Sequence, residues 1–141
     1  MRNWNTGKPA LTWEQLVPGH EFSPVTYQMT ASAVSKYLKA VGQLEEWQSS
    51  SVATYVPPMA LAACAMSAMS KLFTMPAGAI HTSEELAFCK PVLIGAVVSC
   101  HTKVGRKSGR GKFQMLTLEM EILNDRKECV ISGQSSIILT G

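Results

Sequence analysis

The sequence predicts an α+β domain in which an antiparallel sheet wraps around a long central helix. The first observation is the stretch Met59–Phe73, which is rich in Ala, Leu and Met and holds no charge before Lys71. The second is the C-terminal half, from Ala79 onward, where apolar and polar residues alternate as they do in strands. Because two helices precede a run of hairpin-linked strands, the pattern favours a mixed fold with an antiparallel sheet.

The stretch Met59–Phe73 is expected to form the buried centre of the fold. Its 15 residues make a helix of roughly 22 Å, which is too short for a bilayer, since a span needs about 20 apolar residues. Surface helices carry a polar face, whereas this one is apolar or small nearly all round. We therefore expect the sheet and a second subunit to cover it, so that a charge at Ala63 or Cys64 unfolds the protein. Pro58 suits its start, and Pro76 follows its end.

The first half of the chain contains the remaining helices and one strand. Residues 1–17 are polar with scattered Trp and are predicted to form an N-terminal arm. Residues 21–29 are predicted to be a strand and residues 31–41 a helix, which Gly42 ends. Residues 43–56 are rich in Gln, Glu and Ser, so we expect a connection with a short turn of helix.

The second half is predicted to be all strand. Its four strands are residues 79–89, 97–104, 112–123 and 128–139, and the glycine-rich segment 105–111 is predicted to be a hairpin turn. Regular alternation in the first of these strands predicts two faces. One face would hold Ile80, Leu86 and Phe88, and the other His81, Ser83, Glu85 and Cys89.

Length and composition predict one domain over residues 1–141. Only 16% of the residues are charged, against about 25% in typical domains, which suggests that a partner covers part of the surface. A net charge of +3 is too small to indicate nucleic-acid binding. The cysteines are widely spaced, so we interpret them as reduced core residues of a cytoplasmic protein: Cys64, Cys89, Cys100 and Cys129. No signal peptide or membrane span is recognised.

A central helix wrapped by a five-stranded antiparallel sheet is the hotdog architecture, and several short motifs resemble one branch of it. Pro18-Gly19 and the segment Thr30–Gly42 resemble MaoC-like hydratases. Val56–Ala62 and Phe88–Gly95 resemble the FAS1-like hydratase and dehydratase branch. The resemblance covers roughly residues 17–140 and implies a hydratase or dehydratase relative in fatty acid metabolism.

The family carries its acid–base pair in a loop between the two helices, in the order Asp-x-Asn-Pro-x-His. In this chain Gly42 is followed by Gln43 where the Asp would fall, and no His occurs between residues 21 and 80. The usual loop pair is therefore missing. Any hydration of a 2-enoyl thioester would need displaced acid and base groups.

Three residues are candidates for that displaced chemistry. Glu45 and Glu46 are the carboxylates of the connection, and burial by Trp47 would raise the pKa of either one. The alternative interpretation is a pair of solvated loop acids. His81 lies early in a strand, where it is either structural or paired across the site with one of these glutamates.

Two segments are candidates for binding the thioester. The helix start at Pro58 and Met59 offers backbone N–H groups and a positive dipole to a thioester carbonyl. The cationic hairpin, with Arg106, Lys107 and Arg110, would meet the phosphates of coenzyme A or the acidic face of an acyl carrier protein. The alternative for the hairpin is a solvated tip. No acidic cluster surrounds any histidine, so no metal site is expected.

The leading functional prediction is a MaoC-like protein that binds acyl thioesters, and a hydro-lyase if it is active. The resemblance implies no cofactor, with coenzyme A or acyl-carrier thioesters as substrate, and no nucleic-acid or membrane partner. It further implies a homodimer or a heterodimer with a catalytic MaoC-like subunit. The alternatives are a non-catalytic substrate-binding subunit and a hotdog thioesterase. The thioesterase would need a carboxylate near the central helix, and Met59–Phe73 contains none.

Overall fold

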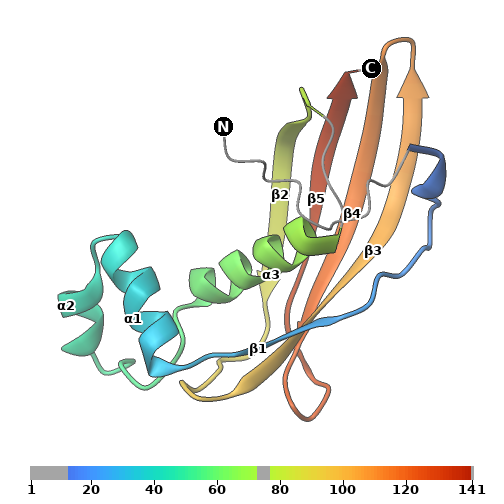
Figure 1. Ribbon diagram of the computed structural model, residues 1–141. Coiled ribbons are helices and arrows are strands. Elements are labelled where there is room, and N and C mark those ends of the chain that lie inside the picture. Colours follow the sequence, from blue (N-terminus) through green and yellow to red (C-terminus); the bar gives the residue numbers. More distant parts are fainter. Residues whose placement is uncertain (1–12, 73–76, 141) are drawn as a thin grey trace.

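The computed structural model describes residues 13–72 and 77–140 and has the predicted α+β architecture, a curved antiparallel sheet with a helix on one face (Figure 1). The strands pair in the order β1-β3-β4-β5-β2. Their bounds are β1 Val25–Gln28, β2 Ile80–Phe88, β3 Val97–Arg110, β4 Phe113–Leu123 and β5 Cys129–Thr140. The helices are α1 Ala31–Ala40, α2 Leu44–Gln48 and α3 Pro58–Leu72, and a 3-10 turn covers Trp13–Gln15.

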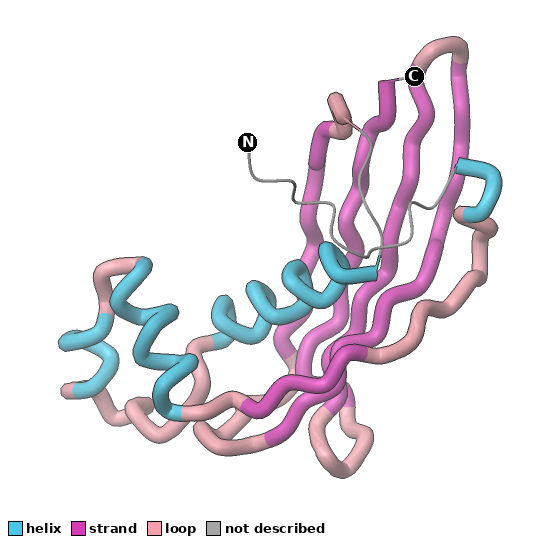
Figure 2. Tube along the Cα trace, viewed as in Figure 1, coloured by secondary structure: helices cyan, strands magenta, loops and turns pink. Residues whose placement is uncertain are grey.

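Helix α3 is the predicted central helix, and it lies across the inner face of the sheet (Figure 2). Its buried side chains are Ala60, Leu61, Ala62, Ala65, Ala68 and Met69. The sheet covers only one side of the helix, and Ala63 is exposed while Cys64 is half-buried. The expectation that Ala63 is buried is therefore wrong for the single chain. Phe73 and Pro76 lie outside the described residues.

Register explains why the inner face of the sheet is apolar. Directly opposed residues of antiparallel strands point to the same side. The rows that meet α3 combine Cys100 with Ile122, and Val104 with Leu118. All of these side chains are at most 3% exposed, so this part of β3 and β4 forms a buried apolar face.

The β3–β4 hairpin is longer than predicted. Segment 105–111 was predicted to be a turn, yet β3 continues to Arg110 and pairs there with Phe113. Gly105 leaves room for the Glu119 side chain, since an added Cβ would lie 3.2 Å from Glu119 Cγ. The turn itself needs only Gly111, at φ 62°, and Lys112.

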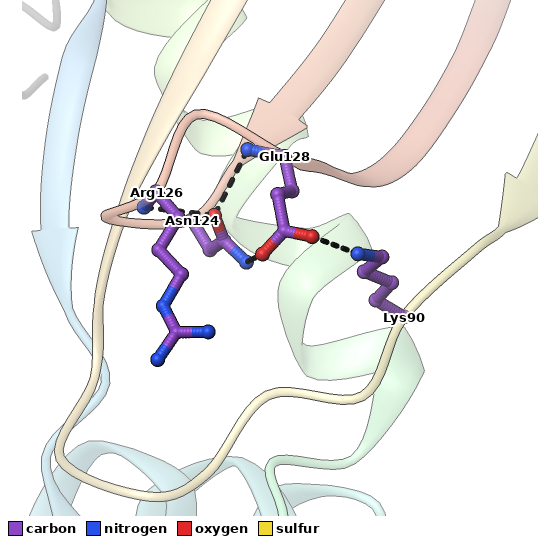
Figure 3. Close-up of polar contacts among 4 residues, drawn as sticks. All are labelled: Lys90, Asn124, Arg126 and Glu128. Carbon is purple, nitrogen blue, oxygen red and sulfur yellow. Dashed lines mark hydrogen bonds and ion pairs between the residues drawn. The ribbon is translucent and has the colours of Figure 1, made fainter.

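The β4–β5 turn is held by one asparagine (Figure 3). Asn124 Oδ1 accepts hydrogen bonds from the backbone N–H groups of Arg126 at 3.0 Å and Glu128 at 2.9 Å. The Asn124 amide also donates to Glu128 Oε1 at 3.2 Å. Glu128 forms an ion pair with Lys90, which follows β2. This contact joins the turn to the β2–β3 connection.

Helices α1 and α2 lie together beyond the start of α3, on the side away from the sheet (Figure 1). Thr30 caps α1 by accepting a hydrogen bond from Ala33 N at 3.1 Å. Helix α2 confirms the short turn of helix expected within residues 43–56. Of the proposed arm, residues 1–12 lie outside the described chain, and Leu16 is 4% exposed within the core.

Candidate functional site

A cavity of about 280 Å³ lies between the second half of α3 and strands β2 and β5. The walls are mostly apolar, and their polar side chains come from both the strands and α3. The lining residues are Met66, Met69, Ser70, Ala79, His81, Ser135 and Ile137. We call this space the α3 pocket.

A β-bulge determines which side chains of β2 face the α3 pocket. His81 is opposite Ile137 and Ser83 is opposite Ser136, so Thr82 is an extra residue in the strand. Without a bulge, residues 81 and 84 would point to opposite faces. The bulge instead places His81 and Glu84 on the same inner side.

The predicted faces of β2 are therefore wrong at their first residues. Ile80 pairs with Ile138 on the outer side and is 54% exposed. Leu86 pairs with Gly133 on the inner side and is half-buried. The physical reason is that period-2 alternation fails across a bulge.

Three polar side chains form a connected group on this inner side. His81 Nε2 lies 2.9 Å from Glu84 Oε2, and Ser135 Oγ donates to the same Oε2 at 2.5 Å. Ser135 is 0% exposed. Glu84 Oε1 is buried and has no hydrogen-bond partner among the described residues. His81, Glu84 and Ser135 are called the polar triad below.

The structure does not bring Glu45 and Glu46 to His81 within one chain. Both glutamates are exposed in the first turn of α2, beyond the start of α3 (Figure 1). The Trp47 indole donates to Tyr55 O at 3.2 Å, so this ring is directed at the following connection. Within the chain, the acid that pairs with His81 is Glu84, which sequence reasoning missed.

The start of α3 is also separate from the α3 pocket. Pro58 and Met59 are exposed, Met59 by 54%, and neither lines the pocket. From Met59 to Met66 the rise along the helix is about 10 Å. The helix start and His81 would therefore contact different parts of a bound ligand.

The cationic hairpin is linked to the α3 pocket by strand register. A second bulge, between Val104 and Lys107, places Lys107 opposite Leu116 on the inner side. Leu116 is opposite Ile137, which is opposite His81. His81 and Lys107 therefore belong to one row, about 14 Å apart across three strand spacings. Arg106 and Arg110 are exposed beside it.

The opposite side of the sheet carries a different set of charges. An open groove of about 920 Å³ includes His101, Lys103 and Glu119. Lys103 pairs with Glu119 at 3.5 Å, and His101 Nε2 lies 2.9 Å from Ser99 Oγ. No carboxylate is paired with His101 among the contacts of the described residues, so this groove lacks a histidine–acid pair.

The four thiols are free, and burial raises the pKa of three of them, Cys64, Cys100 and Cys129. Burial raises the pKa of Cys100 to about 12, with a further contribution from Cys64. Burial likewise raises the pKa of Cys64, whose Sγ lies 3.7 Å from Met29 Sδ. Residues 13–72 and 77–140 contain no group of three metal-ligating side chains. No helix in these ranges is long and apolar enough to cross a bilayer.

Comparison with known proteins identifies a family and a fold. Residues 16–132 match the family described as "FAS1-like, dehydratase domain region". No curated protein sequence matches the chain. A MaoC-like dehydratase from Rhodospirillum rubrum superposes with a TM-score of 0.75 at 20% identity, covering 93% of this chain and 97% of that one.

Two further structures are similar. An unliganded R-hydratase from Pseudomonas aeruginosa gives a TM-score of 0.73 at 16% identity, over 89% of this chain and 83% of that chain. The HadBC (3R-hydroxyacyl-ACP dehydratase) complex from Mycobacterium tuberculosis gives a TM-score of 0.71 at 16% identity, over 86% of this chain and 96% of that chain. At these identities the likeness establishes the hotdog fold.

Proposed function

Because the chain belongs to the FAS1-like dehydratase-domain family, we propose that it binds acyl thioesters of coenzyme A or of an acyl carrier protein. The acyl chain would be a 2-enoyl or 3-hydroxyacyl group, as expected for a relative of MaoC-like hydratases and dehydratases. The α3 pocket carries this proposal. It is concave, mostly apolar and has one polar side, which is the usual character of a small-ligand site.

The size of the pocket favours a short acyl chain. Its volume is about 280 Å³, at the lower limit of typical ligand pockets of roughly 300–1,000 Å³. Met66, Met69 and Ile137 provide apolar contacts for a hydrocarbon chain. Burying each CH₂ group there contributes about 0.8 kcal/mol.

The hairpin offers a place for the phosphates of the carrier. Lys107 lies in the same row as His81, and the extended pantetheine arm of coenzyme A can bridge about 14 Å. Arg106 and Arg110 would add charge near the same end. The cationic side chains therefore support a phosphorylated carrier.

Binding is tested by calorimetry with butyryl-CoA, which has no double bond to hydrate. Ser70→Phe places a ring in the pocket, whereas Ser67→Phe alters an exposed serine one turn earlier that does not line it. We expect Ser70→Phe to weaken binding by at least about tenfold, which corresponds to 1.4 kcal/mol. Ser67→Phe should stay within about twofold. Equal losses in the two variants, or no binding by the wild type, would contradict the proposal.

A second candidate function is a substrate-binding subunit that pairs with a catalytic MaoC-like chain. The loop after Gly42 lacks the usual acid–base pair, and the free edge strand β2 exposes Ile80 by 54% and Phe88 by 48%. The similar HadBC structure is by its name a complex. Phe88→Lys should weaken assembly, whereas Phe113→Lys, at the β3–β4 turn, should not. Sedimentation of both variants would decide, and a monomeric wild type in every mixture would exclude this function.

A further inference from the structure

The polar triad has the geometry of a proton-transfer site. We propose that His81, positioned by Glu84, transfers the proton in the hydration of an enoyl thioester whose acyl chain occupies the α3 pocket. This inference rests on the proposed function, because the chain has to enter the pocket. It replaces the missing loop pair with residues of β2.

The hydrogen bond to Glu84 assigns the roles of the two ring nitrogens. A carboxylate accepts only from a protonated nitrogen, so neutral His81 carries its hydrogen on Nε2. Its lone pair then belongs to Nδ1, which has no partner among the described residues. The side chain is 42% exposed, so the ring is accessible to water and ligand. Nδ1 is therefore the proton acceptor.

Ser135 positions Glu84 in turn. Its Oγ donates to Glu84 Oε2, the same oxygen that meets His81. Ser135 is buried at the centre of β5 and has little freedom to move. A base held by an acid, which is itself held by a third group, is the arrangement that activates a nucleophile in many enzymes.

The burial of one Glu84 carboxylate oxygen is costly for stability, which argues against a purely structural role. Glu84 Oε1 is buried without a hydrogen-bond partner in the described chain, although the side chain as a whole is 24% exposed. A buried acceptor without a partner destabilises a fold. A neutral amide is cheaper to bury than a carboxylate. A chain selected only for stability would gain from Gln at this position.

The chemistry balances with water as the only co-reactant. His81 Nδ1 accepts a proton from water as the oxygen bonds to the β carbon of the double bond. The electron pair of that double bond moves to the α carbon and the thioester carbonyl. The protonated imidazole then returns its proton to the α carbon, which leaves a 3-hydroxyacyl thioester and neutral His81.

The test compares His81→Ala, Glu84→Gln and the control His101→Ala with crotonyl-CoA as substrate. General acid–base groups contribute roughly 10²–10⁴ in rate. We expect His81→Ala to lower kcat by at least 10²-fold while its affinity for butyryl-CoA stays within about threefold of wild type. Added imidazole should restore part of this activity because the site is accessible. His101→Ala should keep the wild-type rate.

The Glu84→Gln variant distinguishes a positioning role of Glu84 in the reaction from a purely structural role. We expect it to lower kcat about tenfold or more with little change in KM, while its resistance to urea is equal to or above wild type. A stability loss without a kinetic effect would overturn the assignment. So would absent turnover by the wild type, full activity of His81→Ala, failure of imidazole rescue, or release of free coenzyme A in place of hydration. Butyryl-CoA binding tests the proposed function separately in each case.

Discussion

Gly133 of β5 and Glu85 of β2 approach so closely that no side chain fits between the strands. A Cβ added at Gly133 would clash with the Glu85 carbonyl oxygen and would lie 2.8 Å from Leu86 Cδ2. The Glu85 backbone cannot move aside as a flexible side chain could. We expect Gly133→Ala to destabilise the protein by about 1–3 kcal/mol, measured by urea denaturation.

The matched control is Gly109→Ala in β3. Its added Cβ would meet nothing nearer than 3.9 Å, and alanine is free to adopt its backbone conformation. We expect a change within about 0.5 kcal/mol. Similar losses in both variants would show that the close approach at Gly133 has no energetic importance.

An Asp substitution should affect folding differently on the two sides of α3. Ala68 is 0% exposed against the sheet, whereas Ala63 is exposed. Ala68→Asp buries an unpaired carboxylate and should prevent folding, because the penalty is several kcal/mol. Ala63→Asp should melt cooperatively near the wild-type temperature. Circular dichroism on heating distinguishes them, and a folded Ala68→Asp protein would refute this orientation of α3.

Cys100 should make stability fall at high pH. Burial raises its folded pKa to about 12 from 9.0, so the folded protein retains a proton that the unfolded chain loses. The stabilisation is complete below pH 9 and is lost between pH 9 and about 12, by up to roughly 4 kcal/mol. Cys100→Ala should show a shallower fall than Cys89→Ala, which leaves the buried thiol in place. Parallel denaturation curves for both variants would disprove the linkage.

The cationic hairpin should make the binding of CoA esters depend on salt concentration. If Arg106, Lys107 and Arg110 contact carrier phosphates, replacing all three with Gln should weaken CoA-ester binding and flatten its dependence on ionic strength. The control replaces Lys90 with Gln at the other end of β2, where the lysine pairs with Glu128. Calorimetry at low and high salt would measure both effects. An unchanged slope in the triple variant would leave the hairpin as a soluble tip.

The architecture was predictable because it follows from patterns that extend over whole helices and strands of the sequence. The charge-free stretch of α3 and the alternation in β4 can be recognised without knowing which elements pack against them. Leu116, Leu118, Met120 and Ile122 all face the core as alternation predicts. The family followed from short motifs of the same sequence. The expected hairpin between the first two C-terminal strands is wrong, because β2 pairs with β5 and lies at the edge of the sheet.

The candidate site was less predictable because it depends on local irregularity. Glu84 is three residues from His81, a spacing that places the two on opposite sides of a regular strand. Its partner Ser135 lies between the polar residues Gln134 and Ser136 in β5, and a serine on the inner side of that strand was the available signal. Glu45 and Glu46 are candidates because they are the carboxylates at the place of the family's loop, and their catalytic role remains a prediction.

The bulge at Thr82 also divides the free edge of the sheet into two parts. A bulge interrupts the row of backbone groups that another strand could pair with. A partner that adds to β2 therefore has regular backbone only from Ser83 to Phe88, after the residue that contacts the pocket. Association and proton transfer thereby depend on neighbouring yet separate stretches of one strand, so that evolution can modify either one while preserving the other.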